Sequence, residues 1–455
     1  MRPTDVRIRE VGFGFEDFRY RTPLKFGGVP VTEVTLLNVT MTVETASGGV
    51  AEGFGSMPLG NVWAWPSKEW TYAQTLDGLK RIAVRMAHIY GVGAPTGHPI
   101  RITHELEKVF PPLSASERGP GGEVSAIPPL ATLVVASPFD AALHDAYGKA
   151  HGLNCYRTYE APFFDDDLGA YLNHPDGPDF GGERLQRYVS TEPQANMPLY
   201  HLVGALDPLT PAEVAVPVGD GGPEHLGDWI RRDGLTHLKI KLNGDDLAWD
   251  VDRIIRVHRI AEGLFPERDF SFSLDFNERC PNVEYLLETL RHVRAASPLG
   301  YGRIQYVEQP TARDLRANPA NRMHQAAKLK PVVIDESLLD LETLLLARDL
   351  GYTGVAFKAC KGQTQSLLLA AAAQKLGLFR CVQDLTCPGA SLVQSAGLAA
   401  HIPGVAAIEA NARQFVPAAN AGWNKRFPGL FETTDGTLHT GQLTGPGLGA
   451  VPTKA

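Results

Sequence analysis

The chain has 455 residues, of which 44% are hydrophobic and 21% charged, with a formal net charge of −8. This composition is typical of globular proteins and excludes a disordered or fibrous chain, and the length predicts two or three domains. The negative charge, without any basic run, excludes a nucleic-acid partner, and the absence of a long apolar run excludes a membrane partner. The first residues lack the apolar core of a signal peptide, so the sequence predicts a cytoplasmic protein.

The N-terminal part, up to about residue 150, predicts strands and turns followed by helices. Val31–Val43 is rich in Val and Thr, and Gly48-Gly49 predicts a turn before the next strand. Helices are predicted over Glu69–Tyr90 and Phe139–Lys149, with a Pro/Gly/Ser-rich loop at 110–130 between them. The stretch Phe163–Asn196 is polar and irregular, which indicates an insertion or a linker.

From Met197 onward, short apolar runs alternate with helical patterns. Leu247–Ile255 repeats its apolar residues at the helical period, and the helices predicted at Asp340–Leu350 and Ser366–Leu376 each stop at a glycine, as left-handed C-caps prefer. Eight apolar strands alternating with helices predict an α/β fold, a closed parallel (β/α)8-type barrel. The predicted strands are Leu199–Val203, His237–Lys241, Ser271–Asp275, Ile304–Glu308, Val332–Asp335, Val355–Lys358, Phe379–Gln383 and Val405–Glu409. The tail after Phe415 is rich in Gly and Pro and is expected to fold back on the N-terminal part.

Five cysteines lie far apart and form no CxxC pair. This spacing suggests neither a disulfide framework nor a thiolate zinc site. We therefore interpret them as buried small hydrophobic residues; they are Cys155, Cys280, Cys360, Cys381 and Cys387.

Charged residues end five of the predicted strands, at positions 241, 275, 308, 335 and 358. Subtracting these positions gives gaps of 34, 33, 27 and 23 residues, close to the roughly 30 residues of one parallel β/α unit. Their side chains are therefore expected at the same ends of neighbouring barrel strands. In (β/α)8 barrels those are the ends where the chemistry takes place.

Asp275, Glu308 and Asp335 come from three consecutive strands with no His or Cys nearby. Hard carboxylate oxygens suit Mg2+, with Mn2+ as a possible substitute, rather than zinc. A divalent cation would also offset the mutual repulsion of three carboxylates. Each acid alone could instead cap a helix or pair with a lysine. Their repetition in three successive units favours a metal site.

Lys241 and Lys358 flank these acids in strand order, and Lys239 shares the strand face of Lys241. A cation as close as Lys239 disfavours the protonated form of Lys241 and would leave a neutral general base near pH 7. Such a base can remove the α-proton of a carboxylate substrate when bound Mg2+ stabilises the resulting enediolate. A second lysine opposite can return the proton on the other face or assist a leaving group.

At these residues the chain resembles the enolase superfamily, specifically its muconate-lactonizing-enzyme-like (mandelate racemase/muconate lactonizing enzyme) group. Weaker likeness extends to Phe139–Asp145, similar to the helix that closes the family's N-terminal domain, and to Gly445–Gly449 in the tail. The main pieces stand in the family's order and spacing. They are Lys239-Ile240-Lys241, Asp275-Phe276-Asn277, Glu308-Gln309-Pro310, Ile334-Asp335-Glu336-Ser337 and Lys358-Ala359-Cys360-Lys361.

The resemblance implies a catalytic barrel at 197–415 and an α+β capping, specificity domain formed by 1–150 and 416–455, joined by a connecting insertion at 151–196. It implies a homo-oligomer that acts on a small-molecule carboxylate. It further implies three sets of site residues: the metal ligands Asp275, Glu308 and Asp335; the acid/base pair Lys241 and Lys358, tuned by Lys239; and Asn277 and Glu336 beside the ligands.

Other residues are candidates for contact with the substrate. Phe26, Trp63 and Trp65 could form a lid over the barrel mouth, although tryptophans are equally often ordinary core. Asp384, Glu409 and Asn411, at the ends of the last two strands, could bind the substrate or cap a helix. His174, in the irregular stretch, could reach the mouth, although a solvated loop histidine is the default expectation.

Three departures from the family pattern narrow the activity. Gly362-Gln363 stands where the family often has Gly-Gly, and the segment after Gln383 lacks the histidine of mandelate-racemase-like members. Glu409-Ala410-Asn411 replaces the Asp-x-Asp of dipeptide epimerases, which disfavours that activity. We therefore expect a magnesium-dependent racemase or epimerase. The alternatives are an acid-sugar dehydratase or cycloisomerase and, more remotely, a Schiff-base lyase with a lysine nucleophile or a catalytically silent scaffold.

Overall fold

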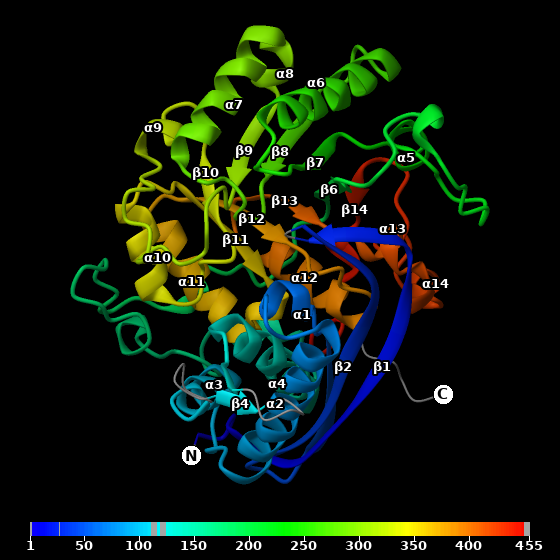
Figure 1. Ribbon diagram of the computed structural model, residues 1–455. Coiled ribbons are helices and arrows are strands. Elements are labelled where there is room, and N and C mark those ends of the chain that lie inside the picture. Colours follow the sequence, from blue (N-terminus) through cyan, green and yellow to red (C-terminus); the bar gives the residue numbers. More distant parts are fainter. Residues whose placement is uncertain (1, 27, 111–115, 119–123, 450–455) are drawn as a thin grey trace.

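A computed structural model describes residues 2–26, 28–110, 116–118 and 124–449. Eight parallel strands form its central barrel, and β13 pairs with β6 to close it, which confirms the predicted fold class. Figure 1 shows this barrel (green to orange) beside the N-terminal region (blue to cyan). The barrel strands are β6 Met197–Val203, β7 His237–Lys241, β8 Ser271–Asp275, β9 Ile304–Glu308, β10 Val332–Ile334, β11 Gly354–Lys358, β12 Phe379–Gln383 and β13 Val405–Glu409.

Helices follow the barrel strands and cover their outer surface (Figure 1). The helix predicted at Asp340–Leu350 is confirmed, because Asp340 caps it and Gly351 (φ 92°) follows its end. The helix predicted from Ser366 begins three residues earlier, at Gln363, because Asp140 from the N-terminal region accepts the backbone N–H of Thr364 at 2.8 Å. The helices are α5 Leu226–Asp233, α6 Leu247–Leu264, α7 Val283–Ala296, α8 Pro298–Gly302, α9 His324–Ala327, α10 Leu341–Asp349, α11 Gln363–Lys375 and α12 Ala390–His401.

The N-terminal region combines an antiparallel sheet with helices. Its sheet has the order β1-β2-β3, and Gly48 (φ 85°) lies in the predicted turn between the last two strands. Its strands are β1 Val6–Phe26, β2 Val29–Thr45 and β3 Val50–Pro58, with a short pair β4 Ser116–Arg118 and β5 Val124–Ala126. Its helices are α1 Asn61–Ala64, α2 Tyr72–Val92, α3 Pro99–Glu107 and α4 Pro129–Ala150.

Two helix starts in this region differ from the predictions. Helix α2 begins three residues later than expected, because Thr71 and Gln74 form a capping box. Helix α4 begins ten residues earlier than expected and contains Pro138. Proline cannot donate to the carbonyl four residues before it, and here the Val134 carbonyl instead accepts the Ser137 hydroxyl at 2.8 Å. The predicted 110–130 loop therefore holds β4, β5 and the start of α4, while 111–115 and 119–123 lie outside the described residues.

The connecting segment and the tail wrap around both regions. Residues 151–196 contain 3-10 turns rather than longer elements, and Phe164 and Phe180 are buried. In the tail, β14 (Thr437–Leu438) pairs with β6, whereas the Leu448 N–H donates to Asp145 Oδ1 of α4 at 2.8 Å. The tail therefore meets the barrel as well as the N-terminal side, and the proposed domain limits stay an interpretation. The remaining elements are η1 Cys155–Thr158, η2 Leu168–Ala170, η3 Leu185–Arg187, η4 Pro211–Glu213, η5 Ala359–Lys361, α13 Ala412–Phe415, η6 Pro417–Asn420, α14 Trp423–Arg426 and η7 Thr440–Gln442.

Helix α4 holds the N-terminal region against the barrel. It crosses β3 so closely that a Cβ on Gly55 would lie 2.0 Å from the Pro138 carbonyl oxygen. On its other side, Asp140 binds the start of α11, just after the strand end that carries Lys358. All five cysteines are free and buried, as predicted. Across the described part of the chain, no helix has the length and apolar character needed to span a membrane.

Candidate active site

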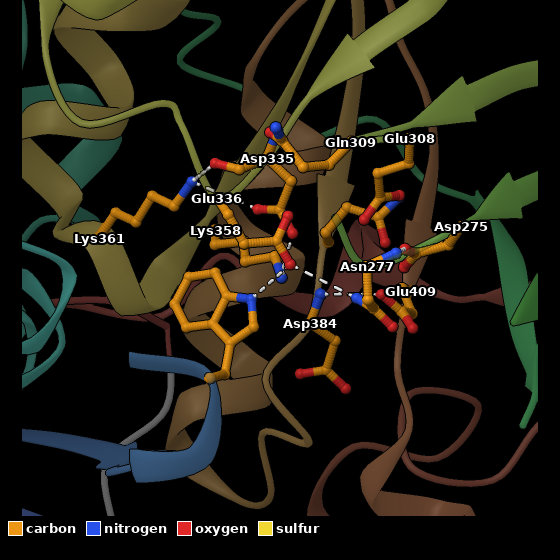
Figure 2. Close-up of polar contacts among 12 residues, drawn as sticks. Asp275, Asn277, Glu308, Gln309, Asp335, Glu336, Lys358, Lys361, Asp384 and Glu409 are labelled. Atoms are coloured by element: carbon orange, nitrogen blue, oxygen red, sulfur yellow. Dashed lines mark hydrogen bonds and ion pairs between the residues drawn. The ribbon is translucent and has the colours of Figure 1, made fainter. Parts of the chain in front are cut away.

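The predicted charged residues meet at one end of the barrel. Lys241, Asp275, Glu308 and Lys358 are the last residues of their strands, and Asp335 directly follows β10. In the closed barrel β7 and β11 are four strands apart, so Lys241 and Lys358 come from opposite sides with the three acidic strands between them. Figure 2 shows the acidic side chains gathered at these strand ends.

Lys239 lies at the centre of the cluster. Its Nζ donates to Glu308 Oε1 at 2.8 Å, to Gln383 Oε1 at 2.7 Å and to Glu409 Oε2 at 3.1 Å, and it lies 3.0 Å from Asp275 Oδ2. Burial lowers the pKa of Lys239, but the neighbouring carboxylates, led by Asp275, outweigh it and raise that pKa well above its ordinary value. Lys239 is therefore a fixed positive charge that joins carboxylates of three strands.

Lys241 shares a carboxylate oxygen with Lys239. Its Nζ donates to Asp275 Oδ2 at 2.5 Å and to Asn277 Oδ1 at 3.0 Å, and the Phe26 ring centre lies 5.6 Å away. Burial raises the pKa of Asp275, but the two lysines outweigh it and lower that pKa below its ordinary value. Asp275 is thus an anion held between two ammonium groups.

On the opposite side, Asp335 is held between Lys358 and Lys361. Lys358 Nζ lies 2.7 Å from Asp335 Oδ2, and Lys361 Nζ donates to the Asp335 carbonyl at 2.5 Å. Burial lowers the pKa of Lys358, but Asp335 outweighs it and raises that pKa above its ordinary value. The Trp63 ring centre lies 4.4 Å from Lys358 Nζ and 5.7 Å from Lys361 Nζ, within cation–π range.

Glu336 links the two sides of the cluster. Its Oε1 accepts the Trp63 indole N–H at 2.9 Å and the Asn277 amide at 3.4 Å, and Asn277 in turn contacts Lys241. Burial and the adjacent Asp335 raise the pKa of Glu336 to about 7. Its Oε2 is buried with no hydrogen-bond partner among the described residues.

The carboxylate set fits a hard divalent cation. Its donors are all oxygens from consecutive strand ends, and Glu308 Oε2 is buried without a hydrogen-bond partner in the described part of the chain. Burial and nearby Asp275 raise the pKa of Glu308 well above its ordinary value, although Lys239 acts in the opposite direction. Across the described residues no group of three His, Cys, Asp or Glu is arranged so that it could hold a metal ion as it stands. Ammonium groups lie against these acids instead. A cation would take over those contacts, and the ligand roles stay a prediction.

Asp384, Glu409 and Asn411 organise the loops after β12 and β13. Asp384 accepts the backbone N–H groups of Cys387 at 2.7 Å and of Asn411 at 2.6 Å, while Glu409 Oε1 accepts the Asn411 amide at 2.7 Å. Burial and Glu409 raise the pKa of Asp384 to about 6. The contacts observed are loop-capping ones, and the predicted contact of these three residues with a substrate stays a prediction.

The proposed lid residues divide into two groups. Phe26, at the end of β1, lies over Lys241, and Trp63, in α1, lies over Lys358. Trp65 does not contact the lysines and stacks on Trp70, with ring centres 5.4 Å apart. His174 accepts the Asp176 N–H at 3.1 Å within its own segment, away from the cluster.

Sequence reasoning gave no role to several residues of this cluster. Gln309, in the left-handed region (φ 30°), accepts the Asp335 N–H at 3.0 Å and so fixes the turn after β10. Gln383 ends β12 and binds Lys239. Its position as a polar residue at the end of an apolar strand was the sequence signal that could have predicted a site role. Lys361 was noted as part of a motif, but nothing in the sequence placed it against Asp335.

Comparisons with known proteins agree with this geometry. The model of the family described as enolase C-terminal domain-like matches residues 223–455. Among solved structures, the fold is similar to an N-succinyl Arg/Lys racemase from Bacillus cereus ATCC 14579 (17% identity, 97% of this chain and 95% of that chain, TM-score 0.63). It is also similar to a 2-chloromuconate cycloisomerase from Rhodococcus opacus 1CP (17%, 97% and 96%, TM-score 0.62) and a dipeptide epimerase from Enterococcus faecalis V583 (16%, 97% and 99%, TM-score 0.61).

At these identities the likeness to solved structures shows the fold alone. No curated protein matches the chain significantly in sequence. The family model, however, covers more than half of the chain and all five of the strand-end charges. The chain therefore belongs to the enolase C-terminal domain-like family, in the mandelate racemase/muconate lactonizing enzyme group of the enolase superfamily.

Proposed function

We propose that this chain is a Mg2+-dependent isomerase, a racemase or epimerase that removes and returns the α-proton of a small-molecule carboxylate. The observation that carries the proposal is the placement of Lys241 and Lys358 on opposite strands of the barrel, with the three strand-end carboxylates between them. A substrate bound between two such lysines presents one face of its α-carbon to each.

Asp275, Glu308 and Asp335 would hold the Mg2+. When bound, the ion would supply electrostatic stabilisation of the negative charge that develops on the substrate carboxylate as the α-proton leaves. The dipeptide epimerase from Enterococcus faecalis V583 is described as complexed with Mg and a dipeptide, which supports this choice of metal.

The two lysines would divide the proton transfer between them. For one stereoisomer Lys358 would act as the acid that delivers a proton, and for the other stereoisomer the two lysines would exchange roles. Lys241, on the other side, would remove the proton from the opposite face, and return of a proton by Lys358 inverts the α-carbon.

Isotope exchange tests this assignment. The protein with Mg2+ in deuterated buffer would be incubated with amino-acid derivatives, dipeptides and acid sugars, and loss of α-proton resonances followed by NMR. We expect Lys241→Ala and Lys358→Ala to abolish interconversion of stereoisomers. Each variant should retain exchange of only one stereoisomer, opposite in the two variants, because each keeps the lysine on one face.

Lys425→Ala, at an exposed lysine outside the cluster, serves as the matched control and should exchange both stereoisomers. Exchange that persists in EDTA, or exchange of both stereoisomers in either site variant, would overturn the proposal. A dehydrated or cyclised product would favour the alternative lyase or cycloisomerase reactions. A covalent adduct trapped by borohydride would favour the Schiff-base mechanism. No exchange, together with no Mg2+ binding by calorimetry, would favour a silent scaffold. Cytoplasmic location and homo-oligomeric assembly stay predictions.

A further inference from the structure

A cavity of about 730 Å3 adjoins the lysine–carboxylate cluster. Asn277 and Glu336 line it. Asn277 contacts Lys241, and Glu336 contacts Trp63, whose ring lies beside Lys358. A molecule that places its carboxylate among the lysines therefore extends its remaining part into this cavity. The cavity lies between the N-terminal region and the barrel loops after β8, β9 and β10.

The N-terminal wall of the cavity is mostly aromatic and apolar; its polar members are Ser67, Lys68 and Thr75. It contains Phe26, Val62, Trp63, Trp65, Trp70 and Tyr72. Trp65 and Trp70 stack with an interplanar angle of 21° and are 2% and 5% exposed, so they form the packed back of this wall. Gly78 of α2 makes room for Trp65, because a Cβ at position 78 would lie 2.9 Å from the indole ring.

The arginine side chains on the barrel wall are already paired within the protein. Arg313 forms a forked interaction with Glu278, and Arg279 pairs with Asp245. On the other wall, Thr75 is hydrogen-bonded to Asn61 and to backbone carbonyls.

Two buried polar atoms of the lining residues have no hydrogen-bond partner among the described residues. They are the Trp70 indole Nε1 and Glu336 Oε2. Unpaired buried polar atoms are rare and call for a ligand or a water. The lining residues therefore hold one unused donor and one unused acceptor, both buried, beside aromatic side chains, and the exposed Lys68 adds a cation to the lining.

We propose that the substrate of this site is a carboxylate with a flat, apolar, preferably aromatic distal group. This inference rests on the proposed function and narrows its substrate. A polyhydroxylated acid would bury several hydroxyl groups against rings that cannot pair with them, which costs free energy for each unmatched hydroxyl. The cavity thus favours the racemase or epimerase reading over acid-sugar dehydration.

Binding of two probes tests the proposal directly. With Mg2+ present, calorimetry would compare 3-phenylpropanoate with gluconate, and tryptophan fluorescence would report occupancy of the wall. We expect 3-phenylpropanoate to bind at least about tenfold more tightly, since ring stacking and area burial favour it. Trp70→Ala should remove most of this preference.

Gly78→Ala supplies a steric test with a matched control. Its Cβ should push Trp65 into the cavity and weaken 3-phenylpropanoate binding by about tenfold, whereas Gly263→Ala, a helical glycine of α6 with open space around it, should leave binding unchanged. Equal binding of both probes, or no effect of Gly78→Ala in a protein with native circular dichroism, would overturn the proposal. α-Proton exchange with acid sugars alone would also overturn it while leaving the proposed function intact. Selective ring binding without any exchange would support the cavity assignment and remove the proposed function.

Discussion

At the scale of single residues, Lys239 organises the cluster. It is buried and contacts carboxylates from β8, β9 and β13. Coulomb attraction at such distances outweighs the desolvation of the ammonium group only because several acids act together. The consequence is a site whose negative charges are held close even though they repel each other.

Replacing this charge should be costly. We expect Lys239→Met to lower the free energy of unfolding by about 3–5 kcal/mol, because it leaves buried carboxylates uncompensated. Added Mg2+ should restore part of the loss, since a cation at Asp275 and Glu308 would supply the missing positive charge. Urea unfolding with and without Mg2+ measures this, with Lys425→Met, at an exposed lysine, as control. A loss of unfolding free energy no larger than that of the control would contradict the role assigned to Lys239.

At the scale of elements, the close packing of α4 on β3 decides where the N-terminal region sits. Gly53 and Gly55 alternate along β3 on the face that meets α4, and each would place a Cβ within 2.2 Å of a helix carbonyl oxygen. The same helix carries Asp140, which binds Thr364 at the start of α11. Helix α4 thus joins β3 on one side to the start of α11, and so to the barrel, on the other.

Gly55→Ala should therefore destabilise the protein. The added methyl group cannot fit against the Pro138 carbonyl, so we expect a loss of about 2 kcal/mol, as in other overpacked interiors. Gly14→Ala on β1, where a Cβ meets nothing within 4 Å, is the matched control and should change stability by less than about 0.5 kcal/mol. Thermal unfolding of the two variants compares them. Equal melting temperatures would mean that α4 can move away from β3 at little cost.

At the scale of the whole molecule, residues 151–196 are fastened to the barrel through His401 at the end of α12. Its ring stacks on Tyr156 at 3.7 Å between ring centres, and its Nδ1 lies 2.7 Å from the Ser190 carbonyl. Burial lowers the pKa of His401 from 6.5 to about 4. The folded protein therefore keeps this imidazole neutral in a pH range where the unfolded chain protonates it.

The sign of the resulting pH dependence follows from proton uptake. Between pH 6.5 and 4 the unfolded state binds more protons at His401, so the stability due to this residue is present above that range and is lost as the pH falls. Relative to His401→Gln, the wild type should lose about 2 kcal/mol of unfolding free energy between pH 7 and pH 5. Urea titrations of both proteins at the two pH values measure the difference. Parallel pH profiles would show that His401 can accept a proton in the folded state.

The local sequence signals determined the barrel and the kind of site. Apolar strand runs ending in Lys241, Asp275, Glu308 and Lys358 reproduce strands β7, β8, β9 and β11 to within a residue, because buried parallel strands need continuous apolar side chains and end where polar ones begin. Helix ends at Gly351 and Gly377 were readable for a similar reason, since left-handed backbone favours glycine.

Only the tertiary structure decided which groups pair and what surrounds them. The start of α11 depends on Asp140, and the interior of α4 tolerates Pro138 through a side-chain hydrogen bond, so neither helix could be delimited from its own residues. The contacts of Lys239 and Lys361 and the aromatic cavity join segments far apart in sequence. A sequence pattern records local propensity and period, whereas charge compensation and cavity shape depend on distances that exist only once the barrel has closed and the N-terminal region has packed over its mouth.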